Sequence, residues 1–489
     1  MTTKADASAA PVILWFRRDL RLADNPALTQ AVATGRPVIP LYILDEAGEG
    51  RPRGAASLWW LDKSLRALSA TLADTGAPLI LRRGDSEGEL RRLIDQTGAD
   101  VVFMNRLFEP DAWTRDADIA HGLKAEGVEC RGFNGSLMCP PGSILTGAGG
   151  PYKVFTPFRN ALLARAEPPP QMAAPRTILT VAGLDSDEID DWRLHPDRPD
   201  WSAGFDWTPG EAAAAQALAA FSSRALKTYS NGRDHPAEIG GSRLSPHLHW
   251  GEVHPWRVIE AVGKAADDGH APQAEADKFT AEIAWREFSA HLLHAFPKIV
   301  DRSFRPEYDA FPWLDDDPGF TAWTRGLTGY PIVDAGMRQL WTTGWMHNRV
   351  RMIVASFLVK DLLIDWRRGE AWFWDTLVDA DLGNNVQNWQ WVAGSGADAS
   401  PFFRIFNPTA QGQRFDAGGD YVRRWVPELK TLPAKWIHAP WMAPPEVLRG
   451  AGVRLGQDYP RPIVDHGQAR DRALAALKAI ARSKYDDQD

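Results

Sequence analysis

The sequence predicts an α/β domain followed by a mostly helical domain. Short, nearly continuous apolar runs recur in the first third of the chain, and segments of helical period separate them, as in a parallel sheet covered by helices on both faces. Beyond Pro209 nearly every segment has helical period instead. A chain of 489 residues exceeds what one hydrophobic core usually organises, which agrees with two domains.

The elements of the first domain follow from this periodicity. Strands are expected at 12–16, 38–44, 79–81 and 101–104, and helices among them at 57–72 and 87–96. The first strand runs into RRDLRL at 17–22, without the GxGxxG turn that binds a pyrophosphate. We therefore do not expect the first domain to bind a dinucleotide.

Prolines interrupt this pattern in the middle of the chain. Three stand in a row at 168–170, so a long linker is expected. Helices are expected beyond it at 211–228, 278–295, 332–343 and 348–364. The predicted domains are 1–139 and 207–489, joined by a linker at 140–206.

Composition excludes several classes of protein. The first ten residues hold no apolar leader and no apolar run could span a bilayer, so we expect a cytoplasmic protein without membrane contact. Two cysteines fit a reducing compartment. The net charge of -8 argues against indiscriminate coating of nucleic acid, so any DNA site must be a local basic patch. His247, His249 and His254 lack nearby acidic or thiol partners, and no metal site is expected.

The run at 379–408, DADLGNNVQNWQWVAGSGADASPFFRIFNP, combines acids, amides and indoles more densely than an ordinary core does. Buried polar groups that lack partners cost about 1 to 3 kcal/mol each. A polar aromatic cofactor would satisfy many of them. The alternative is a polar helix end with two core tryptophans.

Two other segments bring chemically active side chains together. In KFTAEIAWREF, a helix would place Glu282, Trp285 and Arg286 on one face, although an ordinary Glu282–Arg286 ion pair beside a core tryptophan is the alternative. In TGWMHNRVRM, Asn348 and Met352 stand one helical turn apart. The SRLS run at 242–245 offers hydroxyl and backbone N–H groups at a helix start, which suits an anion but also an ordinary N-cap.

These motifs together resemble the DNA photolyase and cryptochrome family. The resemblance rests on the run at 379–408, TGWMHNRVRM at 343–352, FLVKDLLIDWRRGE at 357–370, SRLSPHLHWGE at 242–252 and WFRRDLRLADNPAL at 15–28. It covers nearly the whole chain, and the motifs keep the family's order and spacing. It implies a Rossmann-like domain for an antenna pigment, a linker, and an all-α domain that binds FAD and repairs DNA.

The resemblance also implies roles for single residues. Dimer contact and catalysis would fall to Glu282, Trp285, Asn348, Met352, Trp391 and, beside flavin N5, Asn385. FAD would be bound by Tyr229, Ser242, Arg243, Leu244, Ser245, Phe279, Arg286, Trp345, Arg351, Asp379, Asp381 and Asn385, with Arg351 paired to Asp379. DNA phosphates would contact Arg233, Arg349 and Arg404, and electrons would reach the flavin through Trp389, Trp366 and Trp313.

An antenna pigment is implied less definitely. Asn105 and Glu109 resemble contacts to 5,10-methenyltetrahydrofolate in relatives that bind it. A Cys-Lys pair that helps hold folate in some of them aligns with Val300 and Asp301 here. A deazaflavin, another flavin or no antenna therefore remains open.

The implied activity is that of a cyclobutane pyrimidine dimer photolyase, a carbon-carbon lyase that acts as a monomer on UV-damaged DNA. Light would drive an electron from reduced FAD to the dimer, and photolyases are an established example of base flipping. A plant-type cryptochrome usually has Asp at 385 and Tyr at 391, and a (6-4) photolyase has His at 348 and 352. A plain flavin electron-transfer protein would not need Arg233, Glu282 and Arg349.

Overall fold

The computed structural model describes residues 9–46, 48, 50–195, 198–399 and 403–486. The chain forms two compact units. The first comprises 1–200, 207–227 and 242–297, and the second comprises 201–206, 228–241 and 298–489. Each unit gathers segments from separate parts of the sequence, so the units leave the domain boundaries along the chain untested. The predicted boundaries at 139 and 206 therefore stay a prediction.

A five-stranded parallel sheet forms the centre of the first unit, which confirms the predicted α/β class. The strands are β1 (Val12–Phe16), β2 (Val38–Leu44), β3 (Ile80–Arg83), β4 (Val101–Asn105) and β5 (Glu129–Phe133), in the order β3-β2-β1-β4-β5. Val12 of the central strand lies opposite Val38 on one side and Val101 on the other. The edge strand β5 was not predicted, because its ECRGF sequence is only partly buried and lacks the continuous apolar run of the others.

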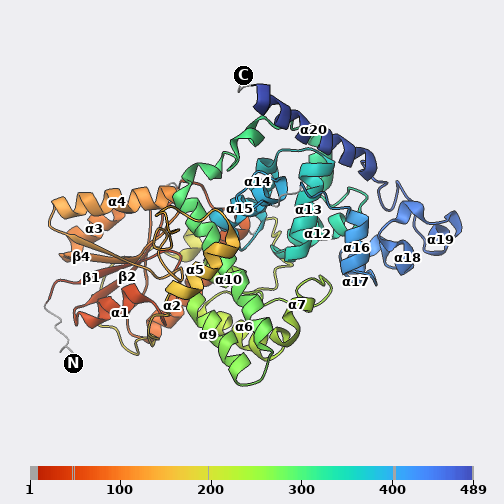
Figure 1. Cartoon of the computed structure of the whole chain (residues 1–489). Coiled ribbons are helices and arrows are strands. Elements are labelled where there is room, and N and C mark those ends of the chain that lie inside the picture. Colours follow the sequence, from red (N-terminus) through yellow and green to blue (C-terminus); the bar gives the residue numbers. More distant parts are fainter. Residues whose placement is uncertain (1–8, 47, 49, 196–197, 400–402, 487–489) are drawn as a thin grey trace. The chain divides into compact units, whose positions relative to one another are not determined.

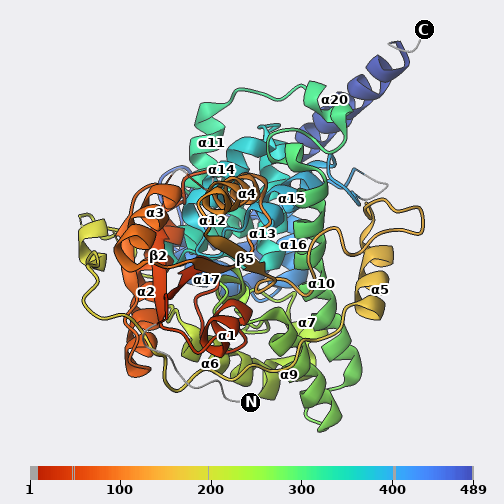
Figure 2. The ribbon, with the colours of Figure 1, turned by 90° about the vertical axis from the view of Figure 1, so that its left-hand side faces the viewer.

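Helices cover both faces of this sheet. They are α1 (Pro26–Ala33), α2 (Ala55–Asp74), α3 (Ser86–Thr97) and α4 (Pro110–Ala125). Helices α3 and α4 lie on one face and α1 and α2 on the other (Figures 1 and 2). Leu90 and Leu93 of α3 and Ile119 of α4 pack in one core with the apolar side chains of β1 and β2.

The rest of the first unit is helical. It contains α5 (Phe155–Arg165), α6 (Glu211–Ser223), α8 (Ser245–His249), α9 (Pro255–Asp267) and α10 (Gln273–Ala295). Helix α5 and the short 3-10 helix at Ile189–Trp192 fall inside the predicted linker. Phe158 and Leu162 of α5 are buried. The segment at 140–206 is therefore partly helical, which its prolines and glycines had obscured.

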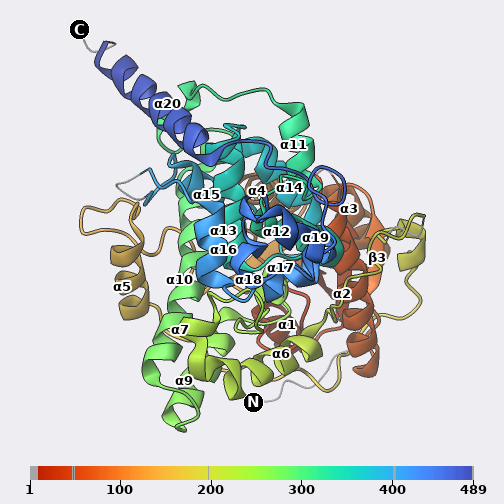
Figure 3. The ribbon, with the colours of Figure 1, turned by 90° about the vertical axis from the view of Figure 1, so that its right-hand side faces the viewer.

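The second unit is mostly helical, as predicted. Its α-helices are α7 (Tyr229–Gly232), α11 (Asp317–Thr324), α12 (Pro331–Thr343), α13 (Asn348–Ser356), α14 (Trp366–Thr376), α15 (Leu382–Ala393), α16 (Pro408–Phe415), α17 (Asp420–Trp425), α18 (Ala434–Ile437), α19 (Pro445–Gly450) and α20 (His466–Asp486). Helix α12 packs against α13, α16 and α17 (Figure 3).

Helix α13 continues into a π-helical turn at Phe357–Asp361, so the helix predicted for 348–364 ends earlier. Leu363 follows in the left-handed region, with φ of 54°. Lys360 of the π-turn is buried and donates to the carbonyl oxygen of Ala393 at 2.7 Å, at the C-terminal end of α15. Burial holds the pKa of Lys360 well below its usual range. The side-chain nitrogen of Lys360 caps the C-terminal end of α15 from inside the unit through this hydrogen bond.

Across the described ranges, helices fall short of the length and apolar character that a membrane crossing requires. The same part of the chain holds no group of three or more His, Cys, Asp and Glu side chains that could bind a metal. The absence of membrane contact and of a metal stays a prediction for the chain as a whole.

Candidate functional site

The start of α15 combines an ion pair with a helix cap. Arg351 of α13 donates to both carboxylate oxygens of Asp379, at 2.9 and 3.1 Å, and to the carbonyl oxygen of Met346 at 2.8 Å. The predicted Arg351–Asp379 pair is therefore present. Asp381 accepts the backbone N–H of Asn384 at 2.9 Å and is the N-cap of α15. The pair neutralises a buried carboxylate, and the cap satisfies the helix start.

Most amides of the run at 379–408 have partners within the protein. Asn388 donates to the carbonyl oxygen of Asn384 at 2.7 Å. Gln390 donates to the carbonyl oxygens of Ile299 and Arg302 at 2.8 and 2.9 Å and accepts from the backbone of Phe304 at 2.7 Å. Gln390 thus fixes a neighbouring loop. The second unit therefore satisfies several polar groups of this run by itself, and a cofactor is needed for fewer of them than the sequence suggests.

Asn385 is the amide whose chemistry still suits a ligand. Its side chain is buried, and Nδ2 donates to Glu370 of α14, at 3.0 Å to the backbone oxygen and 2.7 Å to Oε1. Both amide protons are therefore used, which leaves the carbonyl oxygen as an acceptor. Glu370 fixes the orientation of the amide and was missed by sequence analysis, since 15 residues separate the two along the chain. An amide oxygen held in this way fits a protonated ring nitrogen such as that of a reduced flavin.

The three tryptophans of the predicted relay all belong to the second unit. Trp389 and Trp366 are fully buried, and Trp389 packs edge-on against Phe373 at 5.0 Å between ring centroids. A Cβ atom on Gly369 of α14 would overlap the Trp389 ring, with Cζ3 at 2.5 Å. Helix α14, which begins with Trp366, therefore lies directly against Trp389 because residue 369 has no side chain.

Two indole N–H groups of the predicted relay lack acceptors in the described part of the chain. Within the described ranges, the buried Nε1 atoms of Trp366 and Trp313 have no hydrogen-bond partner. Trp313 packs against Phe311 at 4.4 Å between centroids. Trp391 is half-buried and lies about 200° around α15 from Trp389, so the two indoles point to different sides of the helix. The geometry separates the proposed relay residue from the proposed dimer contact on one helix.

Helix α10 carries four predicted site residues, all in the first unit. Lys278 lies 3.6 Å from the carboxylate of Glu282. The Trp285 ring stacks on Phe155 of α5, with centroids 3.6 Å apart and planes 7° apart. Phe279 packs against Phe221 of α6 at 4.5 Å. One face of Trp285 and the Phe279 ring are thus already engaged by aromatic neighbours.

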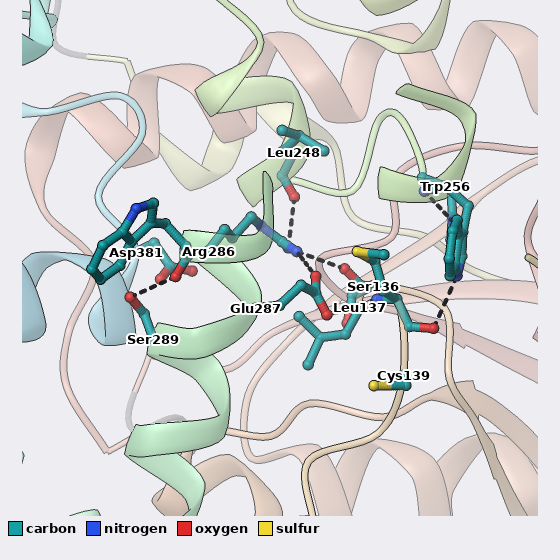
Figure 4. A network of polar contacts seen from close by, with 12 residues as sticks. Ser136, Leu137, Cys139, Leu248, Trp256, Arg286, Glu287, Ser289 and Asp381 are labelled. Atoms are coloured by element: carbon teal, nitrogen blue, oxygen red, sulfur yellow. Dashed lines mark hydrogen bonds and ion pairs between the residues drawn. The ribbon is translucent and has the colours of Figure 1, made fainter. Parts of the chain in front are cut away.

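Arg286 points toward a loop formed by residues 136–139 (Figure 4). It donates to the carbonyl oxygens of Ser136 at 3.0 Å and Leu248 at 3.2 Å and to Glu287 at 3.1 Å. The ion pair of the alternative interpretation, Glu282 with Arg286, is replaced by Lys278–Glu282 and Arg286–Glu287. Arg286 therefore anchors backbone segments of the first unit, and its predicted contact with a cofactor stays a prediction.

Glu287 is a buried acid that sequence analysis missed. Its carboxylate accepts the backbone N–H of Met138 at 2.8 Å. Burial raises the pKa of Glu287 to about 7, against the opposing effects of Arg286 and the backbone donors. Only the path of the chain brings the 136–139 loop to α10, so the WREF sequence alone gave no signal.

Helix α13 begins with a group of polar side chains in the second unit. His347 is the N-cap and accepts the backbone N–H of Arg349 at 3.2 Å. Burial lowers the pKa of His347 to about 4, so it is neutral and can accept this bond. Asn348 is exposed and Met352 is half-buried. Trp345 packs edge-on against His347 at 6.4 Å.

Arg349 has several partners in the second unit. Its guanidinium pairs with Asp234 at 2.8 Å, contacts the sulfur of Met352 at 3.9 Å, and lies 4.5 Å from the ring centre of Phe415. Its side chain keeps 22% of its surface exposed. Arg404, the other predicted phosphate contact in this part of the chain, is exposed. Arg349 is thus held in place yet still accessible.

The remaining predicted cofactor contacts lie on short elements. In the second unit, the ring centre of Tyr229 lies 5.4 Å from Arg233, which is a predicted phosphate contact. In the first unit, Ser242 accepts the backbone N–H of Leu244 at 3.3 Å, and Ser245 opens α8, which confirms the expected helix start. Arg243 has a φ of 55° and lies 4.0 Å from the ring centre of Trp207.

The two predicted antenna residues already have protein partners. Asn105 is buried and donates to Asp19 at 2.5 Å and to Asn25 at 2.8 Å. Glu109 forms an ion pair with Arg18. This geometry lends the antenna prediction no support, and it stays a prediction.

Comparisons with known proteins agree with these features. A family model described as DNA photolyase matches 12–176, and one described as the FAD binding domain of DNA photolyase matches 279–479. A deoxyribodipyrimidine photo-lyase of Agrobacterium fabrum is 52% identical, covering 97% of this chain and 99% of the relative. Cryptochrome-1 of Arabidopsis thaliana is 39% identical, covering 96% of this chain and 70% of that protein. The crystal structure of a bacterial class III photolyase from Agrobacterium tumefaciens has a TM-score of 0.94 and 52% identity, over 98% of this chain and 99% of that one.

An α/β unit with a parallel sheet, a mostly helical unit and the match to the FAD binding domain of DNA photolyase define a flavoprotein. The chain belongs to the DNA photolyase and cryptochrome family. The family prediction and FAD as the cofactor are thereby confirmed. Residue roles inferred from the resemblance stay predictions.

Proposed function

We propose that this protein is a light-driven cyclobutane pyrimidine dimer photolyase. The observation that carries the proposal is the buried, neutral amide of Asn385, fixed through both protons by Glu370. A carboxylate at this position would be like-charged with Glu370, and the amide removes that repulsion. Near full-length identity of 52% to a deoxyribodipyrimidine photo-lyase supports the same reading.

In this proposal FAD contacts are divided among the residues described above. Arg351 neutralises Asp379, and Asn385 offers its oxygen to the ring. The other proposed FAD contacts come from Tyr229, Ser242, Arg243, Leu244, Ser245, Phe279, Arg286, Trp345 and Asp381. When bound and reduced, FAD supplies the electron that light transfers to the dimer. Glu282 accepts hydrogen bonds from the dimer, while Trp285, Asn348, Met352 and Trp391 contact it. Arg233, Arg349 and Arg404 bind DNA phosphates.

The direct test uses one oligonucleotide with a single cyclobutane thymine dimer and a second with a (6-4) photoproduct. The protein with chemically reduced FAD should restore the cyclobutane substrate under blue light and leave it unchanged in darkness. The (6-4) substrate should stay unchanged in both. Absence of light-dependent repair on the first substrate would overturn the proposal.

A blue-light receptor is the second candidate, because a plant cryptochrome is 39% identical over nearly the whole chain. The repair assay separates the two, since a receptor without repair activity would bind FAD and leave the dimer intact. We also propose a monomer in the cytoplasm. An antenna pigment bound by the first unit would add a second absorption band to that of FAD.

The proposed relay has its own test. Replacing Trp366 by Phe should slow photoreduction of oxidised FAD at least tenfold, because phenylalanine is much harder to oxidise. Repair by chemically reduced protein should be nearly unchanged. Trp366→Phe removes volume from a buried site and costs stability of about 1 to 3 kcal/mol, so FAD content must be equal in both proteins. Normal photoreduction in a fully loaded variant would contradict this relay step.

A further inference from the structure

The loop from Tyr229 to Gly240, in the second unit, is closed by two glycines. A Cβ atom on Gly240 would overlap the backbone of Gly232 and lie 2.8 Å from its Cα. Residue 240 must therefore be glycine for the backbones at the two ends of the loop to come into contact. Ile239 comes directly before this neck and is 80% exposed, more than any other large apolar side chain in the described ranges.

Three contacts brace the loop against the helices behind it. Asp234 pairs with Arg349 of α13 at 2.8 Å. The ring of His235 lies 3.3 Å from the carbonyl oxygen of Phe415 on α16. Arg424 of α17 donates to the carbonyl oxygen of Ala237 at 3.3 Å. A single exposed apolar side chain needs no explanation by itself, but this one stands on a loop that is held at its neck and along its length.

Four arginines surround this loop, and we call them the arginine surface: Arg233, Arg349, Arg414 and Arg424. Arg233 belongs to the loop, and Arg424 contacts it. Arg349 and Arg414 lie 4.5 and 5.0 Å from the ring centre of Phe415. Arg414 and Arg424 are exposed, and sequence analysis assigned neither to DNA. The chain has a net charge of -8, so a local group of arginines is where a polyanion would bind.

We propose that Ile239 is an apolar contact for the duplex beside the damaged site, held there by the arginine surface. This inference rests on the proposed function. Extruding a base from a duplex leaves unstacked neighbours, and proteins that deform DNA often insert an apolar side chain between such bases. Arginines fix the register on the phosphates but cannot replace the lost stacking. A braced isoleucine among arginines supplies both parts of that interaction.

The proposal predicts an effect that depends on the second DNA strand. Affinity should be measured for one thymine dimer in a duplex and for the same dimer in a single strand, at one salt concentration. Ile239→Ser should weaken duplex binding roughly tenfold, as expected for losing most of one apolar contact. Binding to the single strand should change by less than about twofold, because no second strand has been left unstacked.

Two further variants complete the experiment. Ile239→Met keeps a large apolar side chain and should bind the duplex nearly as the wild type does. Ile463→Ser is the matched control, because Ile463 is 42% exposed and its backbone N–H donates to the carbonyl oxygen of Thr328, which is outside the loop sequence. Equal losses on both substrates, or no loss on the duplex, would overturn the role of Ile239. If the wild type itself does not prefer damaged DNA, the proposed function fails as well, and that failure is visible without any variant.

Discussion

Two arginine-rich segments of this protein, RRDLRL at 17–22 and HNRVRM at 347–352, look alike in sequence and behave differently in the structure. The first follows β1 at the carboxyl edge of the sheet, where α/β folds commonly bind a ligand. Its Arg21 is buried and donates to the carbonyl oxygens of Asp24, Gly135 and Gly251, each at 2.6 or 2.7 Å. The guanidinium of Arg21 is therefore fully engaged by the protein's own backbone.

The second segment is held more loosely. Arg349 is partly exposed. In the described part of the chain, Asp234 is the one acid within ion-pair distance of its guanidinium. Arg351 meets Asp379 and one backbone carbonyl. Arginine content therefore does not identify a binding site. The number of buried backbone acceptors that each guanidinium satisfies separates a structural arginine from one that is accessible to a ligand.

The largest expected effect concerns Arg21. Replacing it by alanine leaves several buried carbonyl oxygens without a donor, so the free energy of unfolding should fall by about 4 kcal/mol. Arg349→Ala should cost about 1 kcal/mol, because that ion pair is partly exposed. Urea unfolding of both variants measures the difference. Equal losses of unfolding free energy in the two variants would contradict this difference between the two segments.

Glu287 gives a pH test in the first unit. Its pKa of about 7 lies above the value of 4.5 expected in the unfolded chain. The folded protein therefore holds a proton that the unfolded chain has lost, and the stability from neutral Glu287 is complete below pH 4.5 and lost as pH rises to 7. Relative to Glu287→Gln, the wild type should lose about 3 kcal/mol over that range. Parallel curves of unfolding free energy against pH for the two proteins would contradict the raised pKa.

His347 should respond in the opposite direction in the second unit. Its pKa of about 4 lies below the unfolded value of 6.5, so charging it disfavours the folded state. Stability should be complete above pH 6.5 and fall by about 3 kcal/mol toward pH 4. His347→Asn keeps an N-cap for α13 and removes the titration. An acid-induced loss of the same size in that variant would rule out His347 as its cause.

The smallest effect concerns DNA binding by Arg349. If this arginine contacts one phosphate, Arg349→Ala should flatten the slope of log affinity against log salt by roughly one unit. Lys435→Ala is a suitable control, since Lys435 is exposed and lies 4.7 Å from the ring of Trp436 on α18. A slope that is unchanged by the Arg349 variant would make this arginine structural, like Arg21.

Sequence periodicity predicted β1 and β2 with the bounds that the structure gives, because both are fully buried apolar runs. It missed β5 and α5, whose burial is partial. At the site, the Arg351–Asp379 pair came from family resemblance and is present. Glu370 and Glu287 could not be found in this way, because their partners come from distant parts of the chain and only the fold joins them.

The repair quantum yield at saturating substrate is the most direct test of the proposed contact between Glu282 and the dimer. Glu282→Ala should retain FAD yet lower the yield, because losing a charge-assisted hydrogen bond costs about 1.5 to 3 kcal/mol. Lys278→Ala, which removes only the neighbour 3.6 Å from that carboxylate, should repair nearly as the wild type does. A Glu282→Ala protein with full FAD content and an undiminished yield would contradict the proposed contact between Glu282 and the dimer.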